Sequence, residues 1–98
     1  MKLISTTLAG FILTLSAVST SADTDVLFIG NSFTYGFGSA ARFYRADTVT
    51  DLNNEGIGGV PALFKSFTDQ AGLDYDVSLE TRGGSGLDFH LESKLGVI

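Results

Sequence analysis

The chain has 98 residues, a formal net charge of −5 at pH 7 and no cysteine. Because acidic side chains outnumber basic ones, the composition argues against nucleic acid or an anionic membrane as a partner. Without cysteine there are no disulfides, and a single histidine leaves no Cys/His cluster for a metal, so we expect no cofactor.

Residues 1–22 have the pattern of a secretory signal peptide. Lys2 precedes an apolar run over 3–18, and small residues follow, with Thr20 and Ala22 at the −3 and −1 positions of a cleavage site. The run is too short and too rich in hydroxyl groups for a stable membrane span. The alternative is a buried N-terminal helix. We expect a secreted or periplasmic protein whose mature part is residues 23–98.

A short strand is predicted next, over Val26–Ile29. Four apolar residues in a row are typical of a parallel strand that is buried on both faces. The run stops at Gly30, which permits a sharp turn, and Asn31 and Ser32 follow. This order places the Ser32 hydroxyl at the carboxyl edge of a sheet, where ligands collect in open α/β folds. A helix beginning just beyond would direct free N–H groups toward an anion beside Ser32.

The segment 36–59 carries mixed signals. Residues 42–45 could begin a helix, residues 47–52 show no single period, and the Asn and Gly residues of 53–59 are typical of turns. Two interpretations stay open. The segment shapes a substrate pocket, or it is a surface excursion without a role in chemistry.

A helix, a strand and a second helix are predicted after this segment. Pro61 suits the first turn of the first helix, and Gly72 suits the position just after its end. Apolar residues at helical spacing predict one buried stripe: Val60, Leu63, Phe64, Phe67 and Ala71. Residues 73–81 alternate apolar and polar, which predicts a strand with one buried face. A short helix with the spacing of a capping box at Ser85 and Asp88 follows, and three leucines share one of its faces: Leu87, Leu91 and Leu95.

Strand, helix and strand together form a βαβ unit, whose right-handed crossover implies a parallel pair. Both strands then end at the same edge, which brings Ser32 close to Gly83 and Gly84. We predict a three-layer α/β/α fold around a parallel sheet. A domain of this size without disulfides or a metal buries too little surface to be stable alone, so we expect 23–98 to be the N-terminal part of a larger domain, truncated after the second strand and the helix that follows it.

Two motifs carry a family resemblance. The block Gly30-Asn31-Ser32-Phe33-Thr34 resembles the first sequence block of the SGNH (GDSL-like) hydrolases in its Gly-Asn-Ser variant, although better-known members have Asp where Asn31 stands. The stretch Gly83-Gly84-Ser85-Gly86 resembles their second block. The resemblance implies a flavodoxin-like fold with Ser32 as nucleophile and a Gly84 N–H in the oxyanion hole. The family's Asn block, and its Asp and His three residues apart, have no counterpart here.

A nucleophilic serine needs a base, a group that orients the base, and donors for the oxyanion. The N–H groups of Ser32 and Gly84 are the expected donors, with Gly83 or Gly86 as alternatives to Gly84. Asn31 is expected to shape the turn. The only histidine, His90, is expected to be carried away from Ser32 by its helix, as a surface residue or a supporting one rather than the base. Alternatively, Ser32 is only a helix cap and the glycines form only a turn.

We therefore predict an exported serine ester hydrolase that forms an acyl-enzyme on Ser32, acts on an acylated carbohydrate or short acyl ester, and is inactive as this chain alone. One alternative is a non-catalytic α/β domain that binds a carbohydrate or another ligand. Another is a dinucleotide-binding domain, because residues 36–41 read G-x-G-x-x-A. That motif does not directly follow the strand, and no strand with a terminal acid comes after it, which disfavours the dinucleotide hypothesis. The oligomeric state is not predicted.

Overall fold

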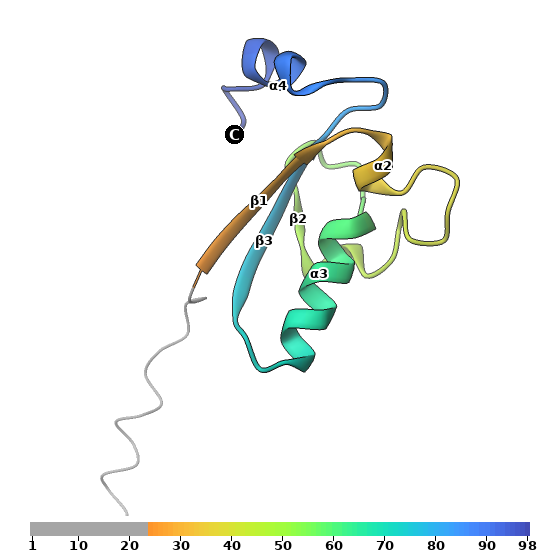
Figure 1. The fold of residues 1–98 in the computed structure, drawn as a ribbon, viewed down its shortest axis with the longest axis vertical. Helices are drawn as coiled ribbons and strands as arrows, with labels where there is room; N and C mark the ends of the chain where they lie inside the picture. The colour runs from red at the N-terminus through yellow and green to blue at the C-terminus, as the bar shows by residue number, and fades with distance from the viewer. Residues whose placement is uncertain (1–23) are drawn as a thin grey trace, which may run out of the picture.

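The computed structural model describes residues 24–98, so the predicted signal peptide lies outside the described residues. Three strands form one parallel sheet in the order β1-β3-β2, with bounds Thr24–Gly30 for β1, Thr50–Asp51 for β2 and Tyr75–Thr81 for β3. The helical segments are α2 (Ser32–Tyr35), the 3₁₀ turn η3 (Ala46–Thr48), α3 (Gly59–Gln70) and α4 (Leu87–Ser93). The prediction of an α/β fold with a parallel sheet is confirmed at this level (Figure 1).

β1 and β3 pair along their whole length, with a register that runs from Thr24 opposite Tyr75 to Gly30 opposite Thr81. Their carboxyl ends therefore meet, as the predicted βαβ unit requires. Figure 1 shows α3 alongside the strands and both α2 and α4 near the ends where β1 and β3 stop. The chain thus gathers two helix starts and one loop at a single edge of the sheet.

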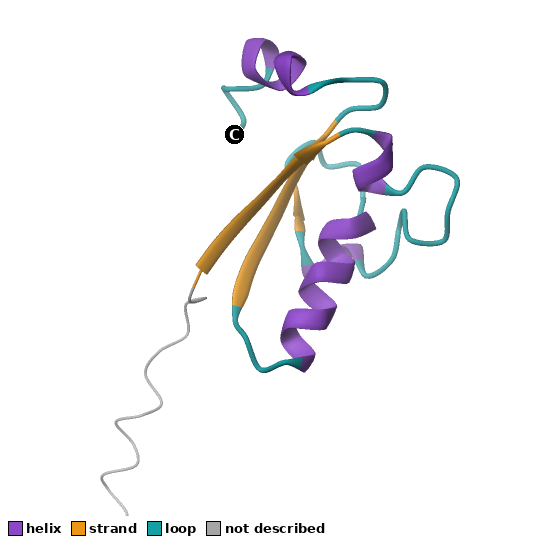
Figure 2. Cartoon of the chain, in the orientation of Figure 1, coloured by secondary structure: helices purple, strands orange, loops and turns teal. Residues whose placement is uncertain are grey.

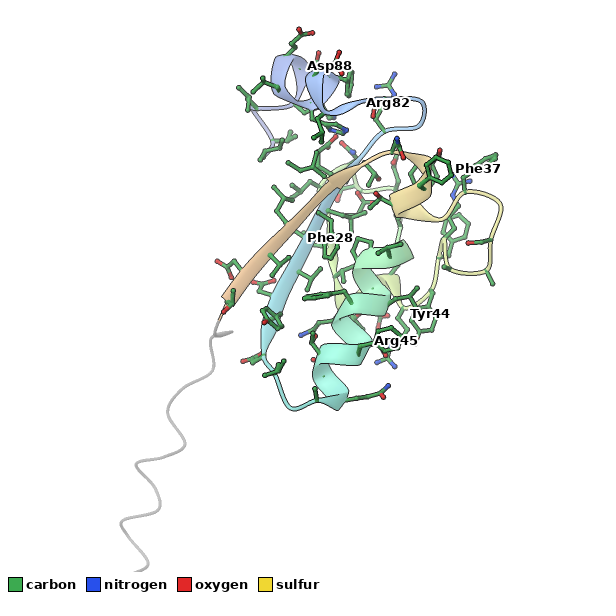
Figure 3. All side chains as sticks on the ribbon, in the orientation of Figure 1. Phe28, Phe37, Tyr44, Arg45, Arg82 and Asp88 are labelled. Carbon is green, nitrogen blue, oxygen red and sulfur yellow. The ribbon has the colours of Figure 1, made fainter. Side chains whose placement is uncertain are left out.

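The apolar core lies between the sheet and α3. Val77 and Leu79 of the central strand β3 are buried, and Phe28 of β1 lies on the same face. The Phe28 ring packs edge-on against Phe64 of α3 with a centroid separation of 5.4 Å, and Phe64 also contacts Tyr75 at 5.3 Å (Figure 3). The predicted core role of Phe64 is confirmed.

The rest of the predicted stripe on α3 is only partly buried. Val60 and Phe67 are 42% and 64% exposed, so the prediction that Phe67 packs in the core is wrong for the described residues. The most buried side of the helix instead includes Ala62 and Ser66, one turn apart. Small side chains let the helix backbone approach the strands, and this rotates the bulky Phe67 outward.

The opposite face of the sheet is largely open. Leu27 and Ile29 on β1 are 38% and 36% exposed, so the prediction of a strand buried on both faces is wrong among residues 24–98. α4 approaches this face at the carboxyl end of the strands, and Val97 and Ile98, which follow α4, lie beside Leu27. Leu87 and Leu91 of α4 and Leu95 in the turn after it (here called the leucine face) are exposed and, with Ile29, line an apolar groove; the helix ends at Ser93, before Leu95.

The segment between α2 and α3 adds the edge strand β2, which was not predicted. Thr50 and Asp51 pair with Ser78 and Leu79 of β3. The Asp51 carboxylate accepts hydrogen bonds from three backbone N–H groups in the turn after β2, those of Asn53, Glu55 and Ile57. Figure 2 shows the long loop beside α2 that completes this segment. These contacts give the segment between α2 and α3 a structural role in the sheet.

No helix among residues 24–98 is long and apolar enough to cross a membrane.

Candidate active site

Ser32 occupies the first position of α2, directly after the end of β1. Asn31 is the N-cap of this helix, and its side-chain oxygen accepts a hydrogen bond from the Phe33 N–H at 3.0 Å. Gly30 is required before it, because a Cβ at this position would collide with the Thr34 hydroxyl. The side chain of Ser32 is half-buried at the edge of the sheet. This is the position that the sequence predicted for it.

The glycine loop that follows β3 lies beside this turn. The loop leaves the strand at Arg82, and the Ser85 N–H closes a turn onto the Arg82 carbonyl oxygen at 3.3 Å. Gly84 has a φ of 71°, a left-handed conformation that favours glycine, and its Cα faces open space. Figure 3 labels Arg82 and Asp88 at the two sides of this loop. The loop and the side chains of Asp88 and Phe89 line a hollow of about 340 Å³.

Two hydrogen bonds tie the Ser32 turn to the glycine loop. The Arg82 N–H donates to the Gly30 carbonyl oxygen at 3.1 Å, and the Asn31 side-chain amide donates to the Ser85 carbonyl oxygen at 3.1 Å. Asn31 therefore uses its oxygen to cap α2 and its nitrogen to hold the loop. The geometry shows Asn31 shaping the turn, and it brings the predicted site residues Ser32 and Gly84 to the same edge.

The backbone N–H groups of Ser32 and Gly84 have no protein acceptor among residues 24–98, and the same is true of Gly83 and Gly86. Free main-chain donors at a strand-to-helix turn and in an adjacent glycine loop are the kind of groups that bind a developing oxyanion. Of the three glycines, Gly84 has the most open surroundings, because a Cβ there would meet nothing within 4 Å, whereas at Gly83 and Gly86 it would stand 2.9 Å from the Tyr35 hydroxyl and the Asp88 carboxylate.

A buried polar cluster lies directly beneath these two turns. His90 of α4 is 2% exposed and Glu80 of β3 is 0% exposed, and their Nδ1 and Oε2 atoms are 3.1 Å apart. The other ring nitrogen, Nε2, lies 3.0 Å from the Gly30 carbonyl oxygen and 3.1 Å from the Ser85 hydroxyl. The expectation that the helix carries His90 away from Ser32 is wrong, because the ring contacts the residue two positions before Ser32.

The partners of the His90 ring indicate which of its nitrogens is the donor toward the two turns. A carbonyl oxygen can only accept a hydrogen bond, so Nε2 carries a proton that it donates to Gly30. On the other side of the ring, Nδ1 faces the Glu80 carboxylate at 3.1 Å. The ring has no free lone pair on the side that faces the two turns. His90, the only histidine of the chain, is therefore not arranged as a base.

Lys94 and Asn53 extend the cluster toward β2. The Lys94 ammonium is 3.6 Å from Glu80 Oε1 and donates to the Asn53 side-chain oxygen at 2.8 Å. The Asn53 amide in turn donates to the Thr81 carbonyl oxygen at 3.1 Å. Glu80 thus lies between two basic side chains, and the cluster connects all three strand ends with α4.

Two other kinds of site considered from the sequence are a dinucleotide site and a metal site. Residues 36–41 form consecutive turns after α2, without the strand-to-helix junction that a dinucleotide fingerprint requires. No group of three His, Cys, Asp or Glu side chains that could hold a metal ion is present in the part of the chain that the structure describes.

The sequence did not predict Glu80 as a member of this site. Its only signals are an acidic residue near the end of a strand, on the face opposite Val77 and Leu79, and a histidine ten positions later beyond a glycine loop. Neither signal indicates burial by itself, because Glu and His are both common on surfaces.

Comparisons of the chain with protein-family models, with curated proteins and with solved structures find no match.

Proposed function

We propose that this chain carries the nucleophile and the oxyanion donors of an exported SGNH-like serine ester hydrolase, with Ser32 as the nucleophile. The observation that supports the proposal best is the joining of two turns at the carboxyl edge of a parallel sheet. One turn holds Ser32 and the other holds Gly84, and the Asn31 amide bridges them. Ligand sites of open α/β sheets lie at this edge.

In the proposed reaction the Ser32 Oγ attacks the carbonyl carbon of a carboxylic ester. A bond forms between Oγ and that carbon while the carbonyl electron pair moves onto its oxygen, and the N–H groups of Ser32 and Gly84 hold this oxyanion. The carbonyl then re-forms as the C–O bond to the leaving group breaks, and the base returns its proton to the departing alkoxide, so that an alcohol leaves and the acyl-enzyme remains. Water releases the acid in a second step. The proposed substrates are an acylated carbohydrate or a short acyl ester.

The Oγ proton must pass to a base. Among residues 24–98 His90 cannot serve as this base, because its Nε2 already donates to the Gly30 carbonyl oxygen. The proposal therefore requires a base from another polypeptide segment or from solution. It follows that the 98-residue chain alone should hydrolyse esters very slowly.

The test is covalent labelling of the purified chain with a fluorophosphonate, with imidazole added as an external base. Oγ attacks phosphorus, fluoride leaves, and the proton passes to imidazole. We expect one adduct on Ser32, located by peptide mass spectrometry. The Ser32→Ala variant should lose the adduct, while the control Ser85→Ala should keep it, since Ser85 is the other candidate nucleophile, with its hydroxyl 3.1 Å from His90 Nε2.

An adduct on Ser85, or none at saturating reagent in a chain that circular dichroism shows to be folded, would contradict the assignment. A folded but unlabelled chain would favour the binding-domain alternative, and glycan-array binding would then be the measurement to make.

A further inference from the structure

We propose that His90 is a positioning residue, which fixes the Gly30–Asn31 peptide and thereby the Ser32 turn against the glycine loop. This inference rests on the proposed function for its catalytic meaning, but its geometry stands apart from that function. The ring contacts three separate segments: Glu80 on β3, the Gly30 carbonyl at the end of β1, and Ser85 in the loop. A side chain in such a place controls how the two strand ends and the loop sit together.

The Gly30 carbonyl oxygen is the critical acceptor. It receives one hydrogen bond from the Arg82 N–H at 3.1 Å and a second from His90 Nε2 at 3.0 Å, so both of its lone pairs are used. With two donors from different segments, the peptide plane that leads into Asn31 has a fixed orientation. The Ser32 N–H and Oγ follow directly along the chain from that plane.

Glu80 holds the imidazole ring of His90 in its orientation. Glu80 lies on the central strand, is fully buried, and bonds Nδ1, so the imidazole cannot rotate without breaking a charged or charge-assisted contact. Lys94 lies on the other oxygen of the same carboxylate. A fixed carboxylate that orients an imidazole, which in turn orients a backbone carbonyl, transmits the rigidity of β3 to the turn at Ser32.

A different interpretation of the same contacts is a Ser85–His90–Glu80 triad with Ser85 as nucleophile. The hydrogen-bond directions argue against it. The Ser85 hydroxyl donates to the Arg82 carbonyl oxygen at 2.7 Å, so its proton does not point at His90. Nε2 already carries a proton for Gly30 and cannot accept another. In this arrangement Ser85 is a further acceptor for the ring rather than a hydroxyl that it activates.

The first measurement is nuclear magnetic resonance of the ¹⁵N,¹³C-labelled chain, in which the single histidine makes the ring signals unambiguous. We expect a slowly exchanging Nε2 proton with a scalar coupling across the hydrogen bond to the Gly30 carbonyl carbon. A deprotonated Nε2 at neutral pH, which a base for Ser85 would show, would overturn the proposal. This result does not depend on any hydrolase activity.

The second measurement compares His90→Gln with His90→Asn. The Gln amide reaches the place of Nε2 and can still donate to Gly30, whereas the shorter Asn amide reaches only the place of Nδ1 and Glu80. We expect His90→Gln to keep the imidazole-assisted labelling rate of Ser32 within about threefold, and His90→Asn to lose about tenfold to a hundredfold, as a misplacement near 1 Å does.

These variants separate positioning from stability and from base catalysis. A merely stabilising role predicts that labelling follows the unfolding midpoint, and a base predicts equal losses in both variants; either result would refute the proposal. If neither variant nor the wild type is labelled, the proposed function fails. In that case the amide shifts of Asn31 and Ser32 still decide the positioning, because they should change in His90→Asn and not in His90→Gln.

Discussion

Replacing Glu80 with glutamine should destabilise the fold by about 3 kcal/mol. Glu80 is fully buried, with one oxygen bonded to His90 and the other 3.6 Å from the Lys94 ammonium. Two unit charges at this separation attract by roughly 4 to 5 kcal/mol at an effective dielectric constant of about 20. Lys94 is partly exposed, so solvent screens part of this energy, and the result falls at the lower end of the range for breaking a buried pair, about 3–5 kcal/mol.

Urea unfolding provides the assay, followed by circular dichroism and by tyrosine fluorescence, since the chain has no tryptophan. With a denaturant slope of about 1 kcal/mol per molar, the expected loss lowers the midpoint by about 3 M or leaves the variant unfolded in water. Glu92→Gln, the same change at an exposed site on α4, is the matched control and should stay within about 0.5 kcal/mol of wild type. If Glu80→Gln unfolds at the same midpoint as this control, the buried cluster contributes no net stability and the reasoning is refuted.

Two further substitutions test the turns around Ser32. Asn31→Asp keeps the oxygen that caps α2 but loses the amide that donates to Ser85, so it should cost about 1–2 kcal/mol in the same urea assay, and an unchanged midpoint would show that the bridge is not formed in solution. Gly59→Ala should be more costly than Gly38→Ala by about 2 kcal/mol, although both glycines have positive φ. The reason is that a Cβ at Gly59 would stand 2.7 Å from the Thr34 carbonyl oxygen, while Gly38 faces open space, and equal midpoints would argue against this packing.

The local elements could be predicted because their signals are periodic. A helix predicted from Val60 to Ala71 forms over Gly59–Gln70, and the alternation over 73–81 forms a strand over Tyr75–Thr81. The helical crossover between the two strands predicts that they run parallel and end at the same edge, which the register from Thr24 to Gly30 confirms. This topology alone predicts that Ser32 and Gly84 lie at the same edge of the sheet, and the prediction needs no knowledge of side-chain contacts.

The features that could not be predicted depend on which side of each helix packs against the sheet. The spacing of Leu87, Leu91 and Leu95 predicts one apolar side, and all three line the same groove although Leu95 follows the end of α4, but spacing does not tell whether that side faces inward. The structure leaves the leucines exposed and instead buries His90, which lies next to Leu87 on the helix and lines the edge of the same groove. Hydropathy gives no signal for a buried Glu–His pair, because the partners are distant in sequence and polar. β2 was missed because two residues are too few to show a period.

Because the leucine face is exposed, α4 is attached to the rest of the molecule mainly by polar contacts. Its main anchors are polar, namely His90 and Lys94 around Glu80, while Leu87, Leu91 and Leu95 are already in contact with solvent. Detaching α4 therefore exposes little new apolar surface, so this local opening has a small heat-capacity change and a weak dependence on urea. The free energy of opening comes instead from the loss of the hydrogen bond and the ion pair that Glu80 makes. Residues that depend on α4 for their geometry, including the turn at Gly30, would lose it together in one subglobal fluctuation long before the sheet under α3 unfolds.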